Sequence, residues 1–157
     1  MKALFGLAAV ATIILVFPAL AASDGRYTIN TPGSVTDNVT GLIWQQCYVS
    51  DKHWDAALAY CEDLYWAGFN DWRLPNIKEL ESLVDKTRSE PAINTDYFEV
   101  PFDDNYGIIG GYFWSSSSRA QNPTSAWGVD FGYGYVSNFG KSASYYYIYA
   151  RCVRGGL

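Results

Sequence analysis

The stretch AWGVDFGYGYVSNFGKS, residues 126–142, carries the pattern that decides the fold of this chain. Its first six residues alternate between apolar side chains and small or polar ones, which is the period of a strand with one buried face. Gly132, Tyr133 and Gly134 follow as a turn signal, and YVSNF returns as a second strand. The stretch therefore predicts an antiparallel hairpin.

Strands are also predicted on both sides of this hairpin. YFWSSSS (112–118) precedes it, and YYYIYARCVR (145–154) follows as one final strand. Short strands with turns are expected before residue 47, around the apolar core of Leu42, Ile43 and Trp44. Residues 86–111 read as a long loop. The last third of the chain is thus strand-rich.

Two helices are predicted between these strand regions. In the first, Trp54, Ala57, Leu58, Cys61 and Leu64 recur at spacings of three and four, which places them on one buried face. Ser50 or Asp51 is expected to cap its start and Gly68 to end it. The second helix begins after Asn76, which forms a capping box with Glu79, and its apolar stripe is Ile77, Leu80, Leu83 and Val84. The fold class is α+β.

Residues 1–22 have the organisation of a secretory signal peptide. Lys2 precedes the apolar run Leu4–Phe17, and small residues form a cleavage site before Ala22. The alternative is a retained membrane anchor over Ala3–Ala22. Residues 23–157 then form a single domain. Removing Lys2 from the 11 basic residues leaves 10 against 16 acidic ones, a net charge of −6, which disfavours nucleic acid as a partner.

The residue types that carry chemistry are scarce. His53, the single histidine, is expected to face solvent, and no zinc-ligand spacing or phosphate-binding loop occurs. Asp103-Asp104-Asn105 could offer oxygens to calcium, but a solvated turn is the favoured interpretation. The three cysteines Cys47, Cys61 and Cys152 allow one disulfide and one remaining thiol in an oxidising compartment, with three pairings open. No cofactor is expected.

The composition near the carboxyl end indicates contact with a partner. Residues 130–149 are almost entirely Tyr, Gly, Ser, Asn and Phe, with one lysine, Lys141. Antibody paratopes use this mixture, because Tyr gives a large contact area at little entropic cost and the small residues adapt their hydrogen bonds. The alternative is an ordinary sheet stabilised by cross-strand aromatic pairs.

Several motifs occur together in the order of a known family. They are TGLIWQQC (40–47), W-x-x-A-x-x-Y-C-x-x-L (54–64), DWRLPNIKELESLVD (71–85), FWSSS (113–117), AWGVDF (126–131) and RCVRG (151–155). Over roughly residues 36–155 the chain resembles the C-terminal domain family of the Legionella collagen-like protein. The resemblance implies a C-type-lectin-like fold of the formylglycine-generating-enzyme type, with two helices and a twisted, mostly antiparallel sheet.

The resemblance also implies a disulfide and a kind of activity. In this fold a cysteine of the first helix commonly pairs with one of the last strand, here Cys61 with Cys152. Enzymes that share the scaffold use a pair of copper-binding cysteines near the carboxyl end, whereas this chain has only Cys152 there. We therefore expect a binding module and not an enzyme. A family member binds sulfated glycosaminoglycans, which the acidic balance of this chain disfavours.

A narrower resemblance covers the hairpin. Variable proteins of bacterial and phage diversity-generating retroelements keep a frame of the form AW-x-V-x-F-x-x-G-x-V-x-x-x-x-K. Trp127, Val129, Phe131, Gly134, Val136 and Lys141 match it. The residues in its gaps can each be encoded by an Asn codon whose adenines have changed. The resemblance implies that the gap positions are diversified and contact the ligand.

These observations favour a secreted or surface-displayed adhesin-like protein that binds a protein or glycan on another cell or surface. A membrane contact is expected only if the N-terminal segment is retained. The expected ligand-binding residues are Gly128, Asp130, Tyr133, Tyr135, Ser137, Asn138, Phe139, Ser142, Ser144 and Tyr145. The alternatives are a structural subunit that self-associates into homo-oligomers through this aromatic face and an oxidase-like enzyme.

Overall fold

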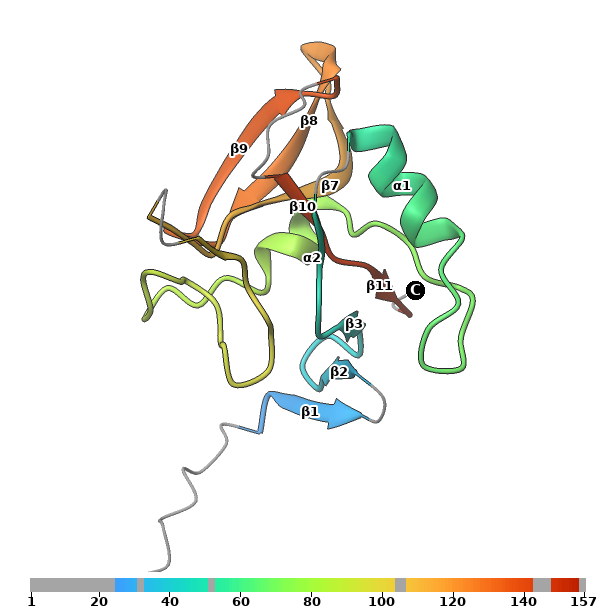
Figure 1. Cartoon of the computed structure of the whole chain (residues 1–157), viewed down its shortest axis with the longest axis vertical. Coiled ribbons are helices and arrows are strands. Elements are labelled where there is room, and N and C mark those ends of the chain that lie inside the picture. The colour runs from blue at the N-terminus through green and yellow to red at the C-terminus, as the bar shows by residue number, and fades with distance from the viewer. Residues whose placement is uncertain (1–24, 31–32, 51–52, 104–106, 143–147, 156–157) are drawn as a thin grey trace, which may run out of the picture.

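The computed structural model describes residues 25–30, 33–50, 53–103, 107–142 and 148–155, which form two main sheets and two helices (Figure 1). One sheet has the strand order β1-β2-β3-β11 and the other the order β4-β10-β7-β8-β9. The strands are β1 Tyr27–Asn30, β2 Ser34–Asp37, β3 Ile43–Gln45, β4 Val49–Ser50, β7 Tyr112–Arg119, β8 Asn122–Asp130, β9 Tyr135–Gly140, β10 Ile148–Ala150 and β11 Val153–Arg154. The predicted α+β class is confirmed, and the predicted signal segment lies outside the described residues.

The hairpin predicted from residues 126–142 is confirmed as β8 and β9. Their register runs from Ser125 opposite Gly140 to Asp130 opposite Tyr135. The turn closes with a hydrogen bond of 2.7 Å from the Gly134 amide to the Asp130 carbonyl. Since β9 is the last strand of its sheet, the hairpin presents one edge and one face outward (Figure 1).

The final strand predicted over residues 145–154 is wrong as a single element. β10 lies between β4 and β7 and runs parallel to β7, with Ile148 opposite Tyr112. β11 pairs with β3 in the other sheet, with Val153 opposite Trp44. A period-two pattern fixes which face of a strand is buried but not which neighbour it joins, so the change of sheet was not visible in the sequence.

Cys152 lies where the chain passes between the two sheets, and it forms the disulfide with Cys61 that the family resemblance implied. The two Cα atoms are 5.5 Å apart, and the closed loop spans a sequence separation of 91 residues. Both cysteines are buried, so Cys61 does lie on the core side of its helix. The disulfide therefore attaches that helix to the junction of the sheets.

The first helix, α1, spans Trp54–Glu62 and is shorter than predicted. Its N-cap residue is His53, whose side chain makes no capping hydrogen bond, and Ser50 instead belongs to β4. The helix ends at Asp63, so the prediction that Gly68 ends it is also wrong. Trp54 holds its first turn against the five-stranded sheet, because its indole nitrogen donates to the Ser115 carbonyl at 2.8 Å.

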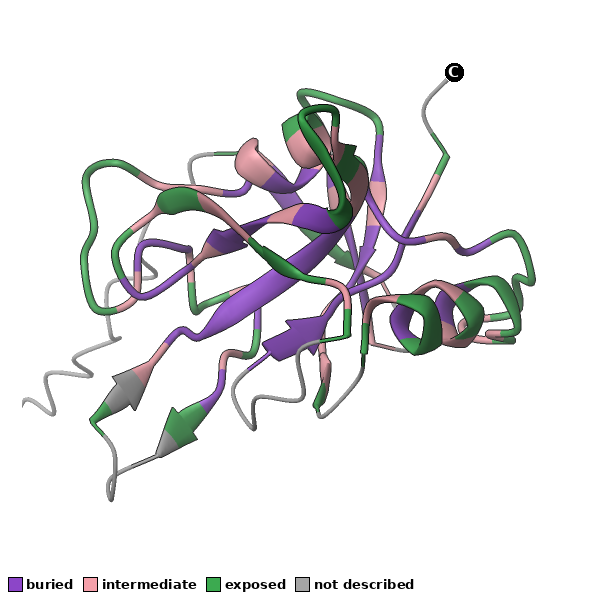
Figure 2. Cartoon of the chain, turned by 90° about the horizontal axis from the view of Figure 1, so that it is seen from above, coloured by how far each residue is buried: buried purple, intermediate pink, exposed green. Residues whose placement is uncertain are grey.

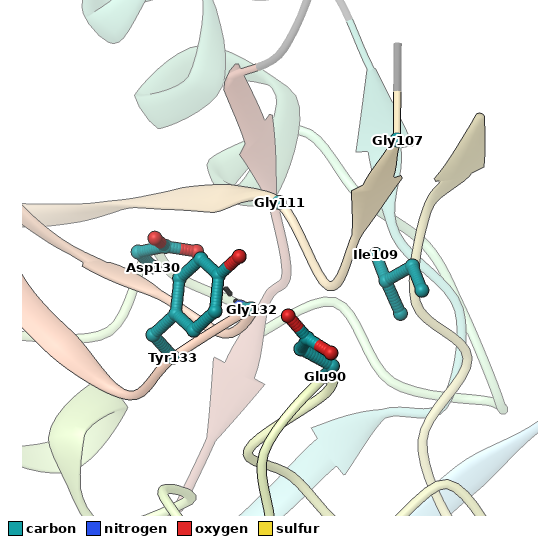
Figure 3. Close-up of a pocket in the computed structure, with 7 residues that line it drawn as sticks. All are labelled: Glu90, Gly107, Ile109, Gly111, Asp130, Gly132 and Tyr133. Carbon is teal, nitrogen blue, oxygen red and sulfur yellow. Dashed lines mark hydrogen bonds between the residues drawn. The ribbon is translucent and has the colours of Figure 1, made fainter. Parts of the chain in front are cut away.

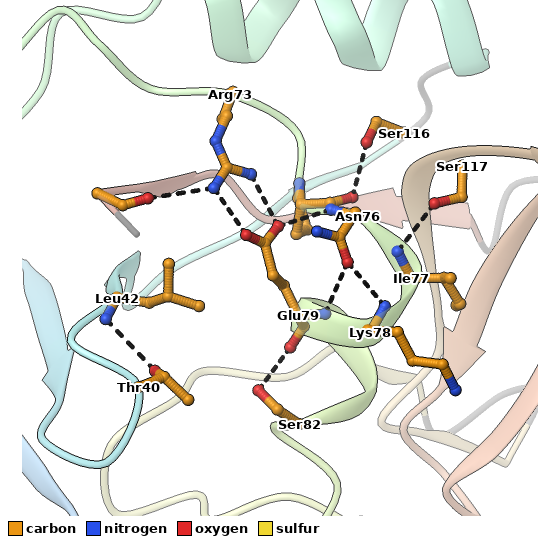
Figure 4. A network of polar contacts seen from close by, with 12 residues as sticks. Thr40, Leu42, Arg73, Asn76, Ile77, Lys78, Glu79, Ser82, Ser116 and Ser117 are labelled. Atoms are coloured by element: carbon orange, nitrogen blue, oxygen red, sulfur yellow. Dashed lines mark hydrogen bonds and ion pairs between the residues drawn. The ribbon is translucent and has the colours of Figure 1, made fainter. Parts of the chain in front are cut away.

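The second helix, α2 (Ile77–Glu81), has the predicted capping box (Figure 4). The Asn76 side chain accepts from the Lys78 and Glu79 amides, and Glu79 accepts from the Asn76 amide at 2.8 Å. Glu79 also forms two hydrogen bonds of 2.7 Å with Arg73. Burial alone would raise the pKa of Glu79, but these hydrogen bonds outweigh it and lower the pKa.

The core consists of two clusters of buried side chains, and the buried stretches of the chain are purple in Figure 2. One lies around Leu80, Phe113 and Phe131, and the other packs α1 against Trp114 and Ala126. The loop predicted over residues 86–111 contributes Ile93 and Phe98 to the first cluster and contains two short strands, β5 Phe102–Asp103 and β6 Ile108–Ile109. This loop packs beside the turn between β8 and β9, where the Glu90 amide donates to the Gly132 carbonyl.

Candidate ligand-binding surface

The β8–β9 hairpin exposes aromatic side chains, which we call the hairpin surface and define as Tyr133, Tyr135 and Phe139. Tyr133 is 57% exposed and Tyr135 is 67% exposed. Their ring centroids are 6.2 Å apart, so they form one contact area instead of two separate ones. Val136 was assigned from the sequence to the fixed frame, yet it is 38% exposed, on the face of β9 opposite to Tyr135.

Phe139 and several other members of the predicted set also make contacts within the protein. Phe139 contacts the Tyr112 ring edge-on with centroids 4.4 Å apart. The Ser137 carbonyl accepts a hydrogen bond of 2.8 Å from the Tyr112 hydroxyl, and the Asn138 amide oxygen accepts one of 3.4 Å from Arg119. Ser137 and Asn138 are half-buried and Ser142 is exposed. The predicted residues Ser144 and Tyr145 lie outside the described residues.

Gly128 requires a correction, because it is buried in the middle of β8 and cannot touch a ligand. A Cβ atom at this position would overlap the Phe113 carbonyl oxygen and lie 2.7 Å from the Tyr112 ring. Glycine at 128 is therefore needed for the close approach of β7 to β8. The alternating pattern counted Gly128 among outward positions, but a residue without a side chain is covered by the large side chains beside it.

Asp130 has a structural task as well as an accessible position. It is half-buried, and one of its carboxylate oxygens accepts a hydrogen bond of 2.7 Å from the Gly132 amide. This hydrogen bond forms an Asx-turn, in which an aspartate side chain accepts from the backbone amide two residues further along the chain. Asp130 thus shapes the turn that displays Tyr133, and it is one of the residues that line a pocket.

This pocket, which we call the turn pocket, has a volume of about 360 Å³. Figure 3 shows its lining, with the Tyr133 ring between the side chains of Asp130 and Glu90. The lining residues are Glu90, Gly107, Ile109, Gly111, Asp130, Gly132 and Tyr133. A hydrogen bond to the Glu90 carboxylate, together with its charge, raises the pKa of Tyr133.

Backbone hydrogen bonds join the three segments around the turn pocket. The Glu90 amide donates to the Gly132 carbonyl at 2.8 Å, and the Ala92 amide donates to the Phe131 carbonyl at 2.7 Å. On the other side, the Phe131 amide donates to the Gly111 carbonyl at 2.8 Å. The pocket walls are therefore held by main-chain bonds and not only by side-chain packing.

Glu90 is the site residue that sequence reasoning missed. It comes from the segment that reads as an unstructured loop, well before the hairpin in the chain. Nothing in its local sequence indicates that this loop runs beside residues 131–132. Only the long-range backbone pairing brings its carboxylate to Tyr133.

At the far end of β9, Lys141 fixes the hairpin against the first helix. Its ammonium lies 3.8 Å from the centroid of the Trp54 ring and donates to the Ser118 hydroxyl at 2.7 Å. A cation over an indole face is attracted by the ring quadrupole. Lys141 was assigned to the fixed frame, and these contacts give that assignment a physical reason.

The residues considered for catalysis and metal binding lie apart from one another. His53 is exposed, as predicted. Cys47 is a half-buried free thiol, and its pKa is raised by burial and by the charge of Glu99. Among the described side chains, no three His, Cys, Asp or Glu groups gather closely enough to hold a metal ion. Asp104 and Asn105 lie outside the described residues.

None of the helices in the described part of the chain has both the length and the apolar character needed to cross a membrane. The fold and the surface together define an α+β domain, closed by a long-range disulfide, with exposed aromatic side chains on a terminal hairpin. The chain matches the model of the Lcl C-terminal domain over residues 33–154, so it belongs to that family, the one that the sequence motifs indicated. Membership is consistent with a surface or ligand-binding role. No curated protein matches the chain.

Proposed function

We propose that this protein is an exported adhesin-like binding protein that uses the hairpin surface to contact a protein or glycan on another cell or surface. The observation that carries the proposal is the pair of neighbouring, largely exposed tyrosines, Tyr133 and Tyr135, on a turn whose backbone is fixed at several points. Exposed apolar area of this kind on a rigid turn marks an interaction site.

The proposal includes the absence of an enzymatic activity. Cys152 is held in a disulfide, which leaves Cys47 as the one free thiol among the described cysteines. The raised pKa of Cys47 keeps it protonated at neutral pH, whereas thiol chemistry needs the thiolate. A binding role fits these residues better than the oxidase-like role of enzymes with the implied fold.

The proposal also includes sequence diversification of the hairpin, but only at gap positions that are not buried. Of the gap positions, Gly128 and Gly132 are buried, and a Cβ atom at Gly132 would lie 2.9 Å from the Ile109 carbonyl oxygen. Variation that preserves the fold is therefore expected at the exposed positions Tyr133, Tyr135 and Phe139. Sequencing the adjacent DNA tests this, since a near-copy of the 3′ coding end with adenines at these codons is expected beside a reverse transcriptase.

The binding test compares two tyrosine variants of the purified, fluorescently labelled protein. Tyr133→Ser/Tyr135→Ser removes the neighbouring rings, and Tyr65→Ser removes a tyrosine after the first helix that is even more exposed, at 73%. Binding is measured on a glycan array and on intact cells. We expect the double variant to lose binding, the control to retain it, and both to keep their melting temperatures. Equal binding by the double variant and the wild type would refute the proposal.

Self-association is the second candidate, and one observation favours it. β9 is the terminal strand of its sheet within the described residues, and it exposes Val136 and Phe139. An exposed edge strand can pair with a second copy of the chain. Analytical ultracentrifugation across a range of concentrations separates the two candidates, because a ligand-binding monomer keeps one sedimentation coefficient.

A further inference from the structure

The turn pocket has a marked charge asymmetry. It contains two carboxylates, from Glu90 and Asp130, and no basic residue is among the described residues that line it. Arg88, two residues before Glu90, forms ion pairs with Asp85 and Asp96 and is not among the residues that line the pocket. The pocket is therefore a concentrated negative site beside the exposed Tyr133 ring.

Besides its two carboxylates, the turn pocket has an aromatic wall formed by Tyr133. Figure 3 shows the Tyr133 ring between the side chains of Asp130 and Glu90, and the Tyr133 hydroxyl donates a hydrogen bond to the Glu90 carboxylate. A cation in this pocket would be attracted by both carboxylates and by the electron-rich tyrosine ring. Among the described lining residues the others are Ile109 and three glycines, whose side chain and main chain would cover the methylene groups of an aliphatic stem.

The carboxylates are held in place before any ligand arrives. Asp130 uses one oxygen to accept from the Gly132 amide, and its other oxygen accepts no hydrogen bond from the described residues. The Glu90 amide donates a hydrogen bond to the Gly132 carbonyl, which fixes the backbone position from which the Glu90 side chain extends. A preorganised site loses little entropy on binding, which suits a small cationic group.

We propose that the turn pocket binds the ammonium group of a lysine side chain presented by a protein partner of the hairpin surface. This inference rests on the proposed function and names the chemistry that the surface recognises. A volume of about 360 Å³ is sufficient for one extended lysine side chain. The same charges repel sulfated or phosphorylated ligands, in agreement with the net charge of −5 for the whole chain.

The test uses a peptide probe and nuclear magnetic resonance on the ¹⁵N-labelled protein. Acetyl-Gly-Lys-Gly-amide is titrated in parallel with the same peptide carrying norleucine or acetyl-lysine in place of lysine. We expect the lysine peptide alone to shift the amides of Gly132, Tyr133 and Glu90. A single ammonium contact predicts a Kd of about 1–10 mM, and raising the salt from 0.05 to 0.5 M, roughly a threefold shorter screening length, should weaken it.

Charge-neutral variants locate the site. Glu90→Gln/Asp130→Asn should weaken lysine-peptide binding by about tenfold or more, while the carboxamide introduced at position 130 can still accept from the Gly132 amide. Glu90→Gln alone leaves that turn bond unchanged and should weaken binding by a smaller factor. The matched control Asp55→Asn/Glu62→Gln neutralises two exposed acids of α1 and should leave the Kd unchanged.

Three outcomes would overturn the inference: no shift of these amides at about 50 mM peptide, equal binding of the acetyl-lysine peptide, or equal weakening by the α1 control. Its failure is distinguishable from failure of the proposed function. If the pocket takes no lysine but Tyr133→Ser/Tyr135→Ser still abolishes binding to cells or glycans, the hairpin surface is the binding site and its ligand has another chemistry.

Discussion

Replacing Gly128 with alanine should unfold or strongly destabilise the protein, because there is no room for the added methyl group. Its Cβ atom would overlap the Phe113 carbonyl oxygen and lie 2.7 Å from the Tyr112 ring, whereas real Cβ atoms essentially never come within 3.0 Å of such atoms. The carbonyl belongs to β7 and is fixed by the ladder with β8, in which Trp114 lies opposite Gly128. The strands can make room only by separating.

The expected cost lies at the upper end of overpacking effects, about 3 kcal/mol or more, since backbone and not a flexible side chain must move. At roughly 4 °C per kcal/mol for a domain of this size, the melting temperature should fall by about 12 °C. Thermal and urea unfolding followed by circular dichroism measure both quantities. The matched control is Gly140→Ala in β9, where an added Cβ meets nothing within 4 Å and where we expect a change within about 0.5 kcal/mol.

A Gly128→Ala protein as stable as Gly140→Ala would refute this reasoning. It would mean that β7 and β8 lie further apart than described and that Gly128 can carry a side chain toward a ligand. The measurement therefore also decides whether position 128 belongs to the frame or to a diversified surface.

Three further predictions concern the fold. Cys61→Ala/Cys152→Ala should lose about 2–5 kcal/mol of unfolding free energy in urea, because it opens a loop of 91 residues; an unchanged midpoint would contradict this. Glu79→Gln should destabilise the protein at pH 7, with the difference shrinking in urea titrations as the pH falls below 4.5, since a lowered carboxyl pKa contributes stability that protonation removes. Lys141→Met should cost about 0.5–1 kcal/mol by losing its contact with Trp54, and equal thermal stability would show that this contact contributes nothing.

Short sequence patterns were sufficient to predict those features that are formed by residues close together in the chain. The Asn76–Glu79 capping box and the β8–β9 turn were both predicted, because each is made by residues within a few positions of one another. The caps of α1 were not. Ser50 has the side chain of a good N-cap, but its backbone pairs with β10, and a tertiary strand contact overrode the local preference.

The candidate site divides in the same way. The sequence identified Tyr133 and Tyr135 as outward-facing from the Tyr-, Ser-, Gly- and Asn-rich composition and from their place in the gaps of the frame. It misplaced Gly128 and Val136, because exposure on a strand depends on what the adjacent strand places over it. It gave no indication of Glu90, which reaches the turn only through the path of a long loop.

By itself the sequence determined the α+β class, the capping of α2, the hairpin and the family, all of which depend on short-range spacing or on ordered motifs. Only the tertiary structure decided that the carboxyl-terminal segment divides between two sheets, that Gly128 is a packing residue, and that a carboxylate from residue 90 stands beside Tyr133. The physical reason is that strand pairing and close packing join residues distant in the chain, and periodicity carries no information about which partner each strand will meet.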